Sequence, residues 1–569
     1  MKVLALHLIN HDANVTYYDG DKATYLNLER VKGIKKYHYY KWDFVNLAED
    51  LKEMGIPSEL DAIVFTAGEL IAEAQADSNL DWGFENDQWV REVSASTFEL
   101  VFDNIPFTAD KYYRVEHHYA HYKCAEWFYG KSDKGLVIDG CGDYGVHISV
   151  FDGDKRVCAI KGNEMPSIGD LYYFTAAELL NEPAKHVADN SLIDRSGNLM
   201  GLISYGKYNH NYAQYLRNLS FEDCVGEAFN KWRYVSIAKI PDENLLYGLH
   251  TPALMPDNRT PSQYAHFAES TVWRHSNERN AVKTWMCDWM YTWQTVLSEK
   301  IIEFIRRYAD EDEKIVYSGG VGHNVVINEQ LNNAFPNLGI PPCVGDEGLS
   351  LGSLKSYLEL TNIEAPECPQ TNWQPKHIPE MNRETVLQLM ELLCHGKVVA
   401  VCQGESHIGP RALGNRSLLY SPNKKYAPHF FNQRKLKNRD FFRPYGIIIL
   451  ESELSKYLHT KTPSPYMLHV AKPTPLGEEM LSGVLHVDHT VRYQTVNDGP
   501  YAELLTLMRD SGYPAAVVNT SLNADGKPMV HTAEEAMSFA LKYMPDYLVL
   551  GNEIYETGIE LDDNGLPLM

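Results

Sequence analysis

Two histidines four residues apart form the sharpest local feature of this sequence that could bind a metal ion. His117 and His121 lie in the segment EHHYAH, which leads into a helical pattern. Residues four apart on a helix share one face, whereas His118 is turned away by about 100°. On the helix alone, an ordinary hydrogen-bonded pair is the favoured interpretation, because histidines at this spacing are common. A metal site therefore needs ligands from elsewhere in the chain.

Two acidic loops offer such ligands. Asp139 stands in DGCGD at the end of an expected strand, and Asp346 stands in GDEG. A set of two imidazoles with carboxylates suits a borderline ion such as Fe(II), Mn(II) or Zn(II). The candidate metal ligands are therefore His117, His121, Asp139 and Asp346.

A second polar group near the N-terminus could supply an acid or a base. His11 and Asp12 follow an apolar run, and Lys36 and His38 come in a segment further on. A histidine beside a carboxylate can accept the proton of an attacking hydroxyl. The alternative is a lone histidine in a surface loop. The candidate catalytic residues His11, Asp12 and His38 thus depend on a shared cleft with the metal.

Two glycine-rich loops, DGCGDYG and SGGVGHN, each follow a short apolar strand. Backbone N–H groups in such loops can surround phosphate oxygens, although neither loop is a Walker A or a dinucleotide fingerprint. Each loop alone is better interpreted as a tight turn, but one loop in each half of a repeated domain leaves nucleotide binding equally open. The candidate nucleotide-binding residues are Asp139, Gly140, Gly142, Gly319, Gly320, Gly322 and Asn324.

Basic residues gather near the C-terminus of a chain that is otherwise acidic. GPRALGNRS precedes a stretch of Arg and Lys, and the segments DHTVR and NTSLN follow. Guanidinium and ammonium groups bind phosphates, so this region is a candidate triphosphate site. A solvated helix face is the alternative, but Phe441 and Phe442 indicate a partly buried segment. The candidates are Arg411, Arg416, Lys437, Arg439, Arg443, Arg492, Asn519, Ser521 and Asn523.

A repeated strand pattern should position the first loops. VLALHL leads into NHDANV and two strands, and GLVID leads into GCGDYG and two strands. Both copies turn at Asp-Gly-Asp-Lys, in Asp19–Lys22 and Asp152–Lys155, and Asp-Gly between alternating strands predicts a hairpin. We therefore predict a duplicated α/β domain, with a long helix near residues 285–307.

Prolines mark the expected end of this domain. Between residues 362 and 380 they interrupt any regular element, which predicts an interdomain linker. The expected parts are residues 1–361, the linker 362–380 and a second α/β domain, 381–569. In the second domain KVVAVC, YGIIIL, AAVVN and DYLVL predict strands, and Thr532 with Glu535 predicts a capping box at a helix start.

Composition limits the partners. The 569 residues include 44% hydrophobic residues, enough for sizeable cores, and carry a net charge of −24, which argues against a nucleic acid as main partner. Nine cysteines without a Cys-x-x-Cys pair fit a reducing compartment and offer no structural zinc site. The first residues become polar too soon for a signal peptide, and no apolar stretch could cross a bilayer, so we expect a cytoplasmic protein without a membrane partner.

Ten motifs occur in a fixed order along nearly the whole chain. They are HHYAH, DGCGD, GNLMGLISYG, a helix with Asp288, Gln294 and Glu299, SGGVGHN, GDEG, GPRALGNRS, KNRDFFRP, VDHTVR and NTSLN. This ordered set resembles the NodU/CmcH family of O-carbamoyltransferases. The resemblance implies a duplicated domain of the actin/Hsp70/sugar-kinase (ASKHA) superfamily, followed by a YrdC-like α/β domain.

The same resemblance implies a reaction in two steps. The C-terminal domain would make carbamoyl-adenylate from carbamoyl phosphate and ATP with Mg²⁺, releasing pyrophosphate. The N-terminal domain would transfer the carbamoyl group to a hydroxyl of a small-molecule acceptor, releasing AMP. Its ligands His117, His121, Asp139 and Asp346 would hold Fe(II) or another divalent transition metal. The expected assembly is a monomer or a homodimer.

The sequence departs from the family pattern at several positions. Asn198 replaces the usual Lys of GNLMGL, and His489 replaces the usual Gly of VDHT. The family's Lys-His pair appears here as Lys36 and His38 with a residue between, and residues 208–285 match poorly.

Other functions fit the motifs less well. A carbamoyltransferase acting on tRNA is opposed by the acidic charge, and a hydrogenase-maturation type would carry Cys-x-x-Cys zinc modules. A non-catalytic nucleotide-binding ASKHA protein would have no need of a second, basic site.

Overall fold

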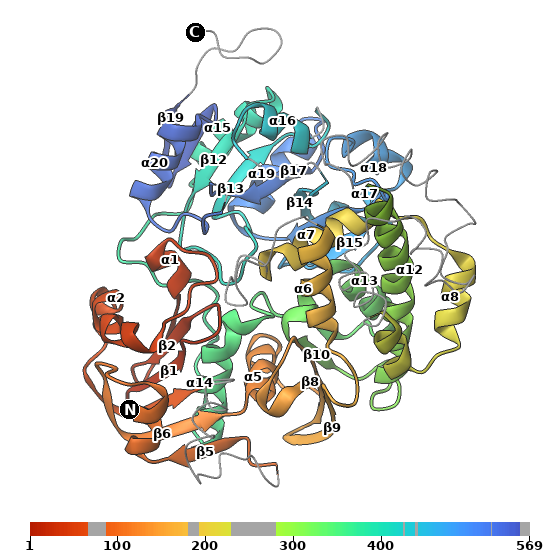
Figure 1. Cartoon of the computed structure of the whole chain (residues 1–569). Coiled ribbons are helices and arrows are strands. Elements are labelled where there is room, and N and C mark those ends of the chain that lie inside the picture. The colour runs from red at the N-terminus through yellow and green to blue at the C-terminus, as the bar shows by residue number, and fades with distance from the viewer. Residues whose placement is uncertain are drawn as a thin grey trace. The chain divides into compact units, whose positions relative to one another are not determined.

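The computed structural model describes residues 1–66, 87–179, 193–228, 280–424, 427–437, 442–524 and 526–557. The chain forms two compact units, which are described separately. The first comprises Met1–Lys131 and Gly339–Met569, and the second comprises Ser132–Leu338. Figure 1 shows their elements. Among the described residues, none of the helices combines the length and apolar character that crossing a bilayer requires.

A six-stranded mixed sheet forms the N-terminal part of the first unit. Its order is β3-β2-β1-β4-β6-β5. The β1-β2-β3 run is antiparallel, whereas β4 and β6 continue the sheet in parallel from β1. The strands are β1 (Val3–His7), β2 (Asn14–Tyr18), β3 (Ala23–Asn27), β4 (Glu59–Phe65), β5 (Val90–Val93) and β6 (Thr108–Val115). Short helices flank them: α1 (Leu28–Lys32), α2 (Leu47–Asp50) and α4 (Ala95–Val101).

The second unit repeats this topology around a five-stranded sheet of order β11-β10-β7-β8-β9. β7 (Lys134–Ile138), β8 (Val146–Asp152) and β9 (Lys155–Lys161) are antiparallel, and β10 (Ile315–Ser318) pairs in parallel with β7. β11 is the short Leu338–Gly339. Both predicted hairpin turns form, with positive φ at Gly20 and Gly153. The predicted duplicated α/β fold is therefore confirmed.

Helices complete the second unit. The long predicted helix is α12 (Asn280–Ile305), which buries Trp289 and Trp293. Further α-helices among the described residues of this unit are α6 (Ile168–Leu179), α7 (Ile193–Ile203), α8 (His210–Arg217) and α13 (Val325–Ala334).

Two helices of the first unit cross at very short range. α5 (His117–Tyr129) begins where the side chain of Glu116 accepts the N–H of Tyr119, and α14 (Leu349–Leu360) follows the short helix η8 (Asp346–Gly348). A Cβ atom at Gly352 would lie 1.8 Å from the carbonyl oxygen of Ala120, so only glycine permits this approach. The crossing brings the first turns of α5 and the segment before α14 together.

An eight-stranded mixed sheet forms the C-terminal part of the first unit, in the order β15-β16-β14-β17-β13-β12-β18-β19. The four predicted strands are β12 (Val399–Cys402), β14 (Gly446–Leu450), β17 (Ala516–Ser521) and β18 (Tyr547–Leu550). The others are β13 (Arg416–Tyr420), β15 (His469–Ala471), β16 (Val491–Val496) and β19 (Glu553–Glu556). Its helices are α15 (Arg383–Cys394), α16 (Ala427–Gln433), α17 (Leu454–Tyr457), α18 (Pro475–Met480), α19 (Gly499–Asp510) and α20 (Ala533–Tyr543). The predicted capping box at Thr532 and Glu535 begins α20.

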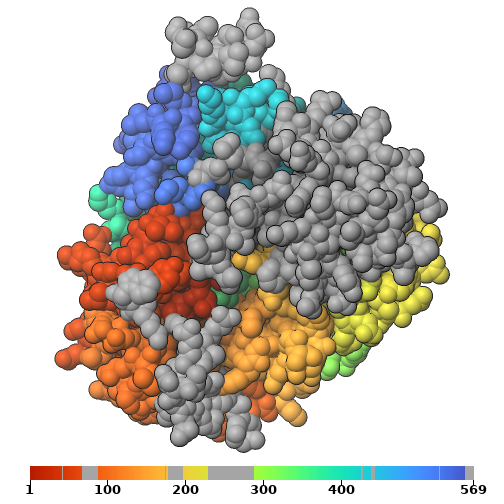
Figure 2. All heavy atoms as spheres, in the orientation of Figure 1, coloured from red at the N-terminus to blue at the C-terminus, as the bar shows by residue number. Residues whose placement is uncertain are grey.

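The proline-rich segment 362–380 lies between these two parts. It forms no helix and only isolated β-bridges, but its residues are packed. Asn372 is fully buried and donates to the carbonyl of His407, and the backbone of Trp373 donates to that of Tyr25. Arg30 of α1 donates to carbonyl oxygens of Gly409 and Met529. Figure 2 shows the N-terminal segment (red) directly against the C-terminal one (blue). Within this unit, the two parts thus share buried contacts.

Candidate functional site

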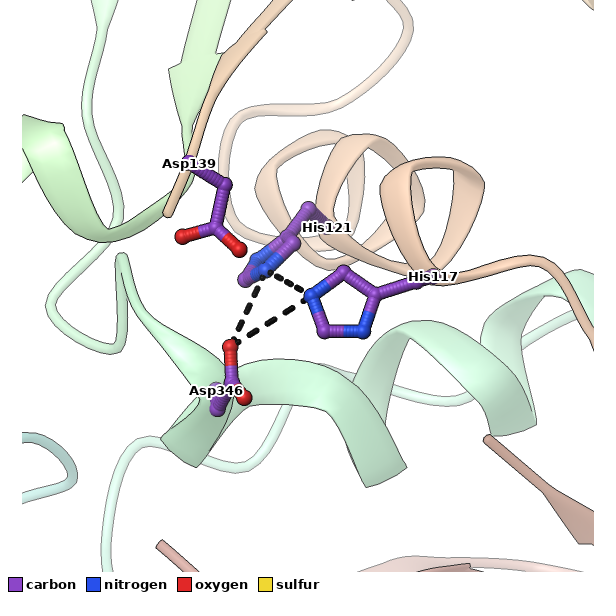
Figure 3. Close-up of side chains that lie close together, drawn as sticks. All are labelled: His117, His121, Asp139 and Asp346. Carbon is purple, nitrogen blue, oxygen red and sulfur yellow. Dashed lines mark hydrogen bonds and ion pairs between the residues drawn. The ribbon is translucent and has the colours of Figure 1, made fainter. Parts of the chain in front are cut away.

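The carboxylate of Asp346 is the point on which four histidines of the first unit converge. His117 and His121 lie in the first turns of α5, with their Nε2 atoms 3.1 Å apart. These atoms lie 3.5 and 3.3 Å from Oδ1 of Asp346, which begins η8 (Figure 3). All three side chains are buried. The predicted pairing of the two histidines on one helix face is therefore confirmed.

This arrangement fits a divalent metal. Within the first unit three residues could each offer one ligand atom, and these atoms lie within 4.8 Å of one another: His117, His121 and Asp346 (Figure 3). Two imidazole nitrogens with a carboxylate oxygen suit a borderline transition metal. Asp139 belongs to the second unit, and its role as a ligand stays a prediction.

Two further histidines face the other carboxylate oxygen of Asp346. The Nε2 atoms of His7 and His11 lie 3.6 and 3.7 Å from Oδ2. His7 ends β1 and is fully buried, and the sequence analysis missed it because it sits in an apolar strand. The only signal for His7 in the sequence was an ionisable residue at the end of an otherwise apolar strand.

The protonation of these groups depends on their shared burial. Burial alone would raise the pKa of Asp346, but His11 and His117 hold it well below its usual range. Burial would also lower the pKa of His11, yet Asp346 and Asp12 raise it to about 9. Burial lowers the pKa of His7 to about 4. The cluster therefore combines an ionised carboxylate with one basic and one neutral histidine.

His11 is held by the predicted acid/base loop. Its Nδ1 lies 2.9 Å from Oδ2 of Asp12, and Nζ of Lys36 donates to the same oxygen at 2.8 Å. Burial would raise the pKa of Asp12, but Lys36 and His11 lower it. Asn10, Asp12 and Lys36 have φ values of 70°, 57° and 54°, a left-handed conformation that is costly for residues other than glycine. Backbone strain is thus concentrated in this loop.

His38 is less closely attached to this group. It is half-buried and packs edge-on against the ring of Tyr40, and burial together with His11 lowers its pKa. Its catalytic role stays a prediction.

Polar side chains of β2 and β3 fix the segment around Asp346. Asn14 is fully buried and donates to the carbonyl oxygens of Asp12 and Asp346, while its own oxygen accepts the N–H of Ser350. The hydroxyl of Tyr25 donates to the carbonyl of Glu347. Sequence reasoning missed both residues. The buried polar positions Asn14 and Thr16, which share one face of β2, were the available signal.

In the second unit, the glycine-rich loops form tight turns. Oδ1 of Asp139 accepts the N–H of Gly320 at 2.7 Å, and Gly319 passes so close to Ile138 that a Cβ atom would not fit. The N–H groups of Gly142 and Gly322 donate within their own turns, to Val146 and Gly319. For Gly140, a Cβ atom would meet no neighbour.

Asn324 has a clear structural role. Its oxygen caps α13 by accepting the N–H groups of Val326 and Ile327, and its nitrogen donates to Tyr172 and Gln294. Nucleotide binding by Asn324 and by the glycine-rich loops stays a prediction.

In the C-terminal part, three predicted phosphate-site residues meet. Lys437 is buried, and its Nζ donates to Oδ1 of Asn523 at 2.6 Å and to Oγ of Ser521 at 3.4 Å. Ser521 is the last residue of β17 and Asn523 follows it, so both lie at a strand end, as predicted. Arg439 lies outside the described residues.

Arg416 is occupied by the protein itself. Arg416 begins β13, and its guanidinium donates five hydrogen bonds of 2.6 to 3.2 Å. The acceptors are the side chain of Gln374 and the carbonyl oxygens of Gln403, Gly404, Asn415 and His531. This fully buried arginine thus holds the strand and its neighbouring loops together.

The remaining predicted residues of this region lie partly exposed or in the sheet. Asn519 on β17 is buried and donates to the carbonyl of Ala412. Arg411, Arg443 and Arg492 are all partly exposed. His489 has a φ of 56°, so it adopts the left-handed conformation that glycine favours at this turn.

Known families match both parts of the chain. The carbamoyltransferase N-terminus matches residues 2–354, and the carbamoyltransferase C-terminus matches residues 390–557. The fold and the histidine–aspartate centre thus lie in regions that this family shares. The chain belongs to the carbamoyltransferase family.

Relatives at low identity share about half of their length with this chain. Uncharacterized protein MJ1051 of Methanocaldococcus jannaschii is 31% identical over 263 residues, which cover 42% of this chain and 50% of that protein. The 3'-hydroxymethylcephem-O-carbamoyltransferase of Amycolatopsis lactamdurans is 28% identical over 285 residues, 46% of this chain and 52% of that protein. Nodulation protein NolO of Bradyrhizobium diazoefficiens is 26% identical over 265 residues, 42% and 48% of the two chains.

Among solved structures, (R)-2-hydroxyglutaryl-CoA dehydratase component A of Acidaminococcus fermentans has a TM-score of 0.31 at 10% identity. It covers 63% of this chain and 97% of its own.

Proposed function

We propose that this chain is an ATP-dependent O-carbamoyltransferase that acts on a hydroxyl of a small-molecule acceptor. Family membership supports carbamoyl transfer, and one similar protein is named for O-carbamoylation of a hydroxymethylcephem. The observation that carries the proposal is the buried convergence of His117, His121 and Asp346 beside the His11–Asp12 pair.

The centre would hold Fe(II) or another divalent transition metal through His117, His121 and Asp346, with Asp139 as the fourth proposed ligand. Such an ion, when bound, supplies Lewis acidity for a carbonyl or phosphoryl oxygen. The protein's own contribution is a dry, rigid ligand set, because the crossing of α5 and α14 fixes the donors.

The acid/base loop would handle the proton of the acceptor. When the hydroxyl oxygen attacks the carbamoyl carbon of carbamoyl-adenylate, the bond from that carbon to the phosphate oxygen breaks and AMP leaves. In its neutral form His11 would accept the hydroxyl proton, and Asp12 and Asp346 would stabilise the protonated form that results. Because they raise its pKa to about 9, the neutral form prevails only at alkaline pH. Lys36 would keep Asp12 ionised and oriented. His38 is the further proposed residue of this group.

The C-terminal domain, proposed to be YrdC-like, would make the carbamoyl-adenylate. There water would cleave carbamoyl phosphate to carbamate and phosphate. A carbamate oxygen would then attack the α-phosphorus of ATP with Mg²⁺, so that the bond from that phosphorus to the bridging oxygen breaks and pyrophosphate leaves. Lys437 beside Ser521 and Asn523 offers a cation and hydroxyl and amide groups for phosphates, and Arg443 and Arg492 lie partly exposed in the same part of the chain. Arg411, Arg439 and Asn519 complete the proposed set, whereas Arg416 would act by holding the strands.

Pyrophosphate release tests this proposal directly. The purified full chain would be incubated with ATP and Mg²⁺, with and without carbamoyl phosphate, and pyrophosphate would be measured by a coupled enzyme assay. We expect release only when carbamoyl phosphate is present. ATP that stays intact with carbamoyl phosphate present would contradict the proposal and favour a non-catalytic nucleotide-binding protein.

A further inference from the structure

Both ring nitrogens of His7 contact other protein groups, and the proposed mechanism gives His7 no role. Its Nδ1 lies 2.9 Å from the hydroxyl of Thr66, at the end of the neighbouring β4. Its Nε2 lies 3.1 Å from the carbonyl oxygen of His11 and 3.6 Å from Oδ2 of Asp346. The ring is 2% exposed, so these protein groups are its environment.

These neighbours determine the tautomer of the ring. A carbonyl and a carboxylate can only accept hydrogen bonds, so Nε2 must carry a proton to face both. A neutral ring then has a bare Nδ1, which accepts the hydroxyl proton of Thr66. Thr66 is itself buried, and therefore holds the ring in this state.

The position of His7 separates it from the metal ligands. His117 and His121 face Oδ1 of Asp346, whereas His7 faces Oδ2. A nitrogen that donates its proton to a carbonyl has no lone pair to offer an ion. His7 therefore lies behind the carboxylate rather than among its metal ligands.

We infer that His7 is a positioning residue, which orients Asp346 and the His11 loop from a single N–H group. By donating to the carbonyl of His11, it supports the strained loop from Asn10 to Asp12. By facing Oδ2, it turns Oδ1 of Asp346 toward His117 and His121. This inference rests on the proposed metal centre and adds a physical link between that centre and the proton acceptor. Histidine ligand sets commonly depend on such outer hydrogen bonds.

Cobalt binding by the full chain tests the role of His7 without any need for an acceptor. Co²⁺ would be titrated into metal-free protein, and affinity, stoichiometry and visible absorption would be recorded for wild type, His7→Leu and His7→Gln. We expect His7→Leu to weaken Co²⁺ binding by about 10- to 100-fold and to change the absorption spectrum. We expect His7→Gln to restore most of the affinity, because its amide keeps an N–H donor at the ε position.

Two additional variants control for general damage to the fold. His469→Leu removes another buried histidine, on β15, and should leave Co²⁺ binding unchanged. Thr66→Val removes only the hydroxyl that fixes the tautomer, and a loss of roughly 3- to 10-fold is expected. If His7→Leu does not fold, the loss in Thr66→Val decides the question.

The possible outcomes distinguish a failure of the proposed role of His7 from a failure of the proposed metal centre. Equal affinity and spectra in wild type and His7→Leu, or in wild type and Thr66→Val when His7→Leu is unfolded, would overturn the role of His7 alone. Two bound ions in wild type and one in His7→Leu would show that His7 is a ligand, which also overturns it. No Co²⁺ binding by wild type would contradict the proposed metal centre together with this inference.

Discussion

The cluster around Asp346 and the basic region around Arg416 use charged side chains in opposite ways. In the cluster, imidazoles from α5 and from the end of β1 and its loop all turn toward one carboxylate. In the basic region, Arg416 turns toward carbonyl oxygens of its own loops, and Lys437 toward Asn523. The first arrangement gathers nitrogen and oxygen atoms that could bind a cation, and the second holds strands and loops together by hydrogen bonds. A charged residue in a motif can therefore serve the fold as well as the chemistry.

A substitution in the cluster around Asp346 should have the largest effect, because it should sharply lower carbamoyl transfer and leave pyrophosphate release intact. His121→Ala removes an imidazole donor, so we expect carbamoyl transfer to fall by at least about 100-fold and bound metal to be lost. Pyrophosphate release should continue, because the proposed adenylate site is elsewhere. Metal content measured by mass spectrometry, with both activities measured in parallel, checks this. A variant that keeps metal and transfer would contradict the role of the centre.

A substitution in the basic region should impair only the formation of carbamoyl-adenylate. Lys437→Met keeps much of the side-chain volume but removes the ammonium group beside Asn523 and Ser521. Because a charge-assisted contact to phosphate is worth about 1.5–3 kcal/mol, we expect pyrophosphate release to fall roughly 10- to 100-fold. Metal content should stay at the wild-type level. Normal pyrophosphate release by a folded Lys437→Met protein would remove Lys437 from the proposed site.

Buried histidines of the C-terminal part make the stability of the fold depend on pH. Burial lowers the pKa of both His407 and His469 to about 4, and that of His531 to about 3. Between pH 6.5 and 4 the unfolded chain therefore binds more protons than the folded one, so the free energy of unfolding falls as pH falls through this window. One such histidine contributes on the order of 3 kcal/mol at the acid end.

The measurement is denaturant unfolding of the metal-free chain at several pH values. His469→Leu should show a shallower loss of stability between pH 6.5 and 4 than wild type. An identical pH dependence in the two proteins would show that His469 does not stay neutral in the fold. His11, whose pKa the carboxylates raise, should not contribute a loss of stability in the same window.

Local patterns explain what the sequence could predict. The spacing of His117 and His121 defines one helix face, and the Asp-Gly turns define hairpins, so both were predictable from neighbours in the chain. The capping box at Thr532 is local in the same sense.

Long-range contacts explain what it could not. His7 looks like part of an apolar strand until the fold brings Asp346 to it from 339 residues away in sequence. Arg416 looks like a phosphate ligand until five acceptors from separate segments surround it. The close crossing that needs Gly352 likewise depends on a helix more than 200 residues away in sequence.

The position of a bound metal would show whether His117, His121 and Asp346 form a metal centre. Crystals of the purified protein, grown with Fe(II) or Co²⁺, would be measured at the absorption edge of that metal. We expect an anomalous peak about 2.0–2.2 Å from Nε2 of His117, Nε2 of His121 and Oδ1 of Asp346. A peak located elsewhere, or these three side chains bonded only to one another at full metal loading, would contradict it.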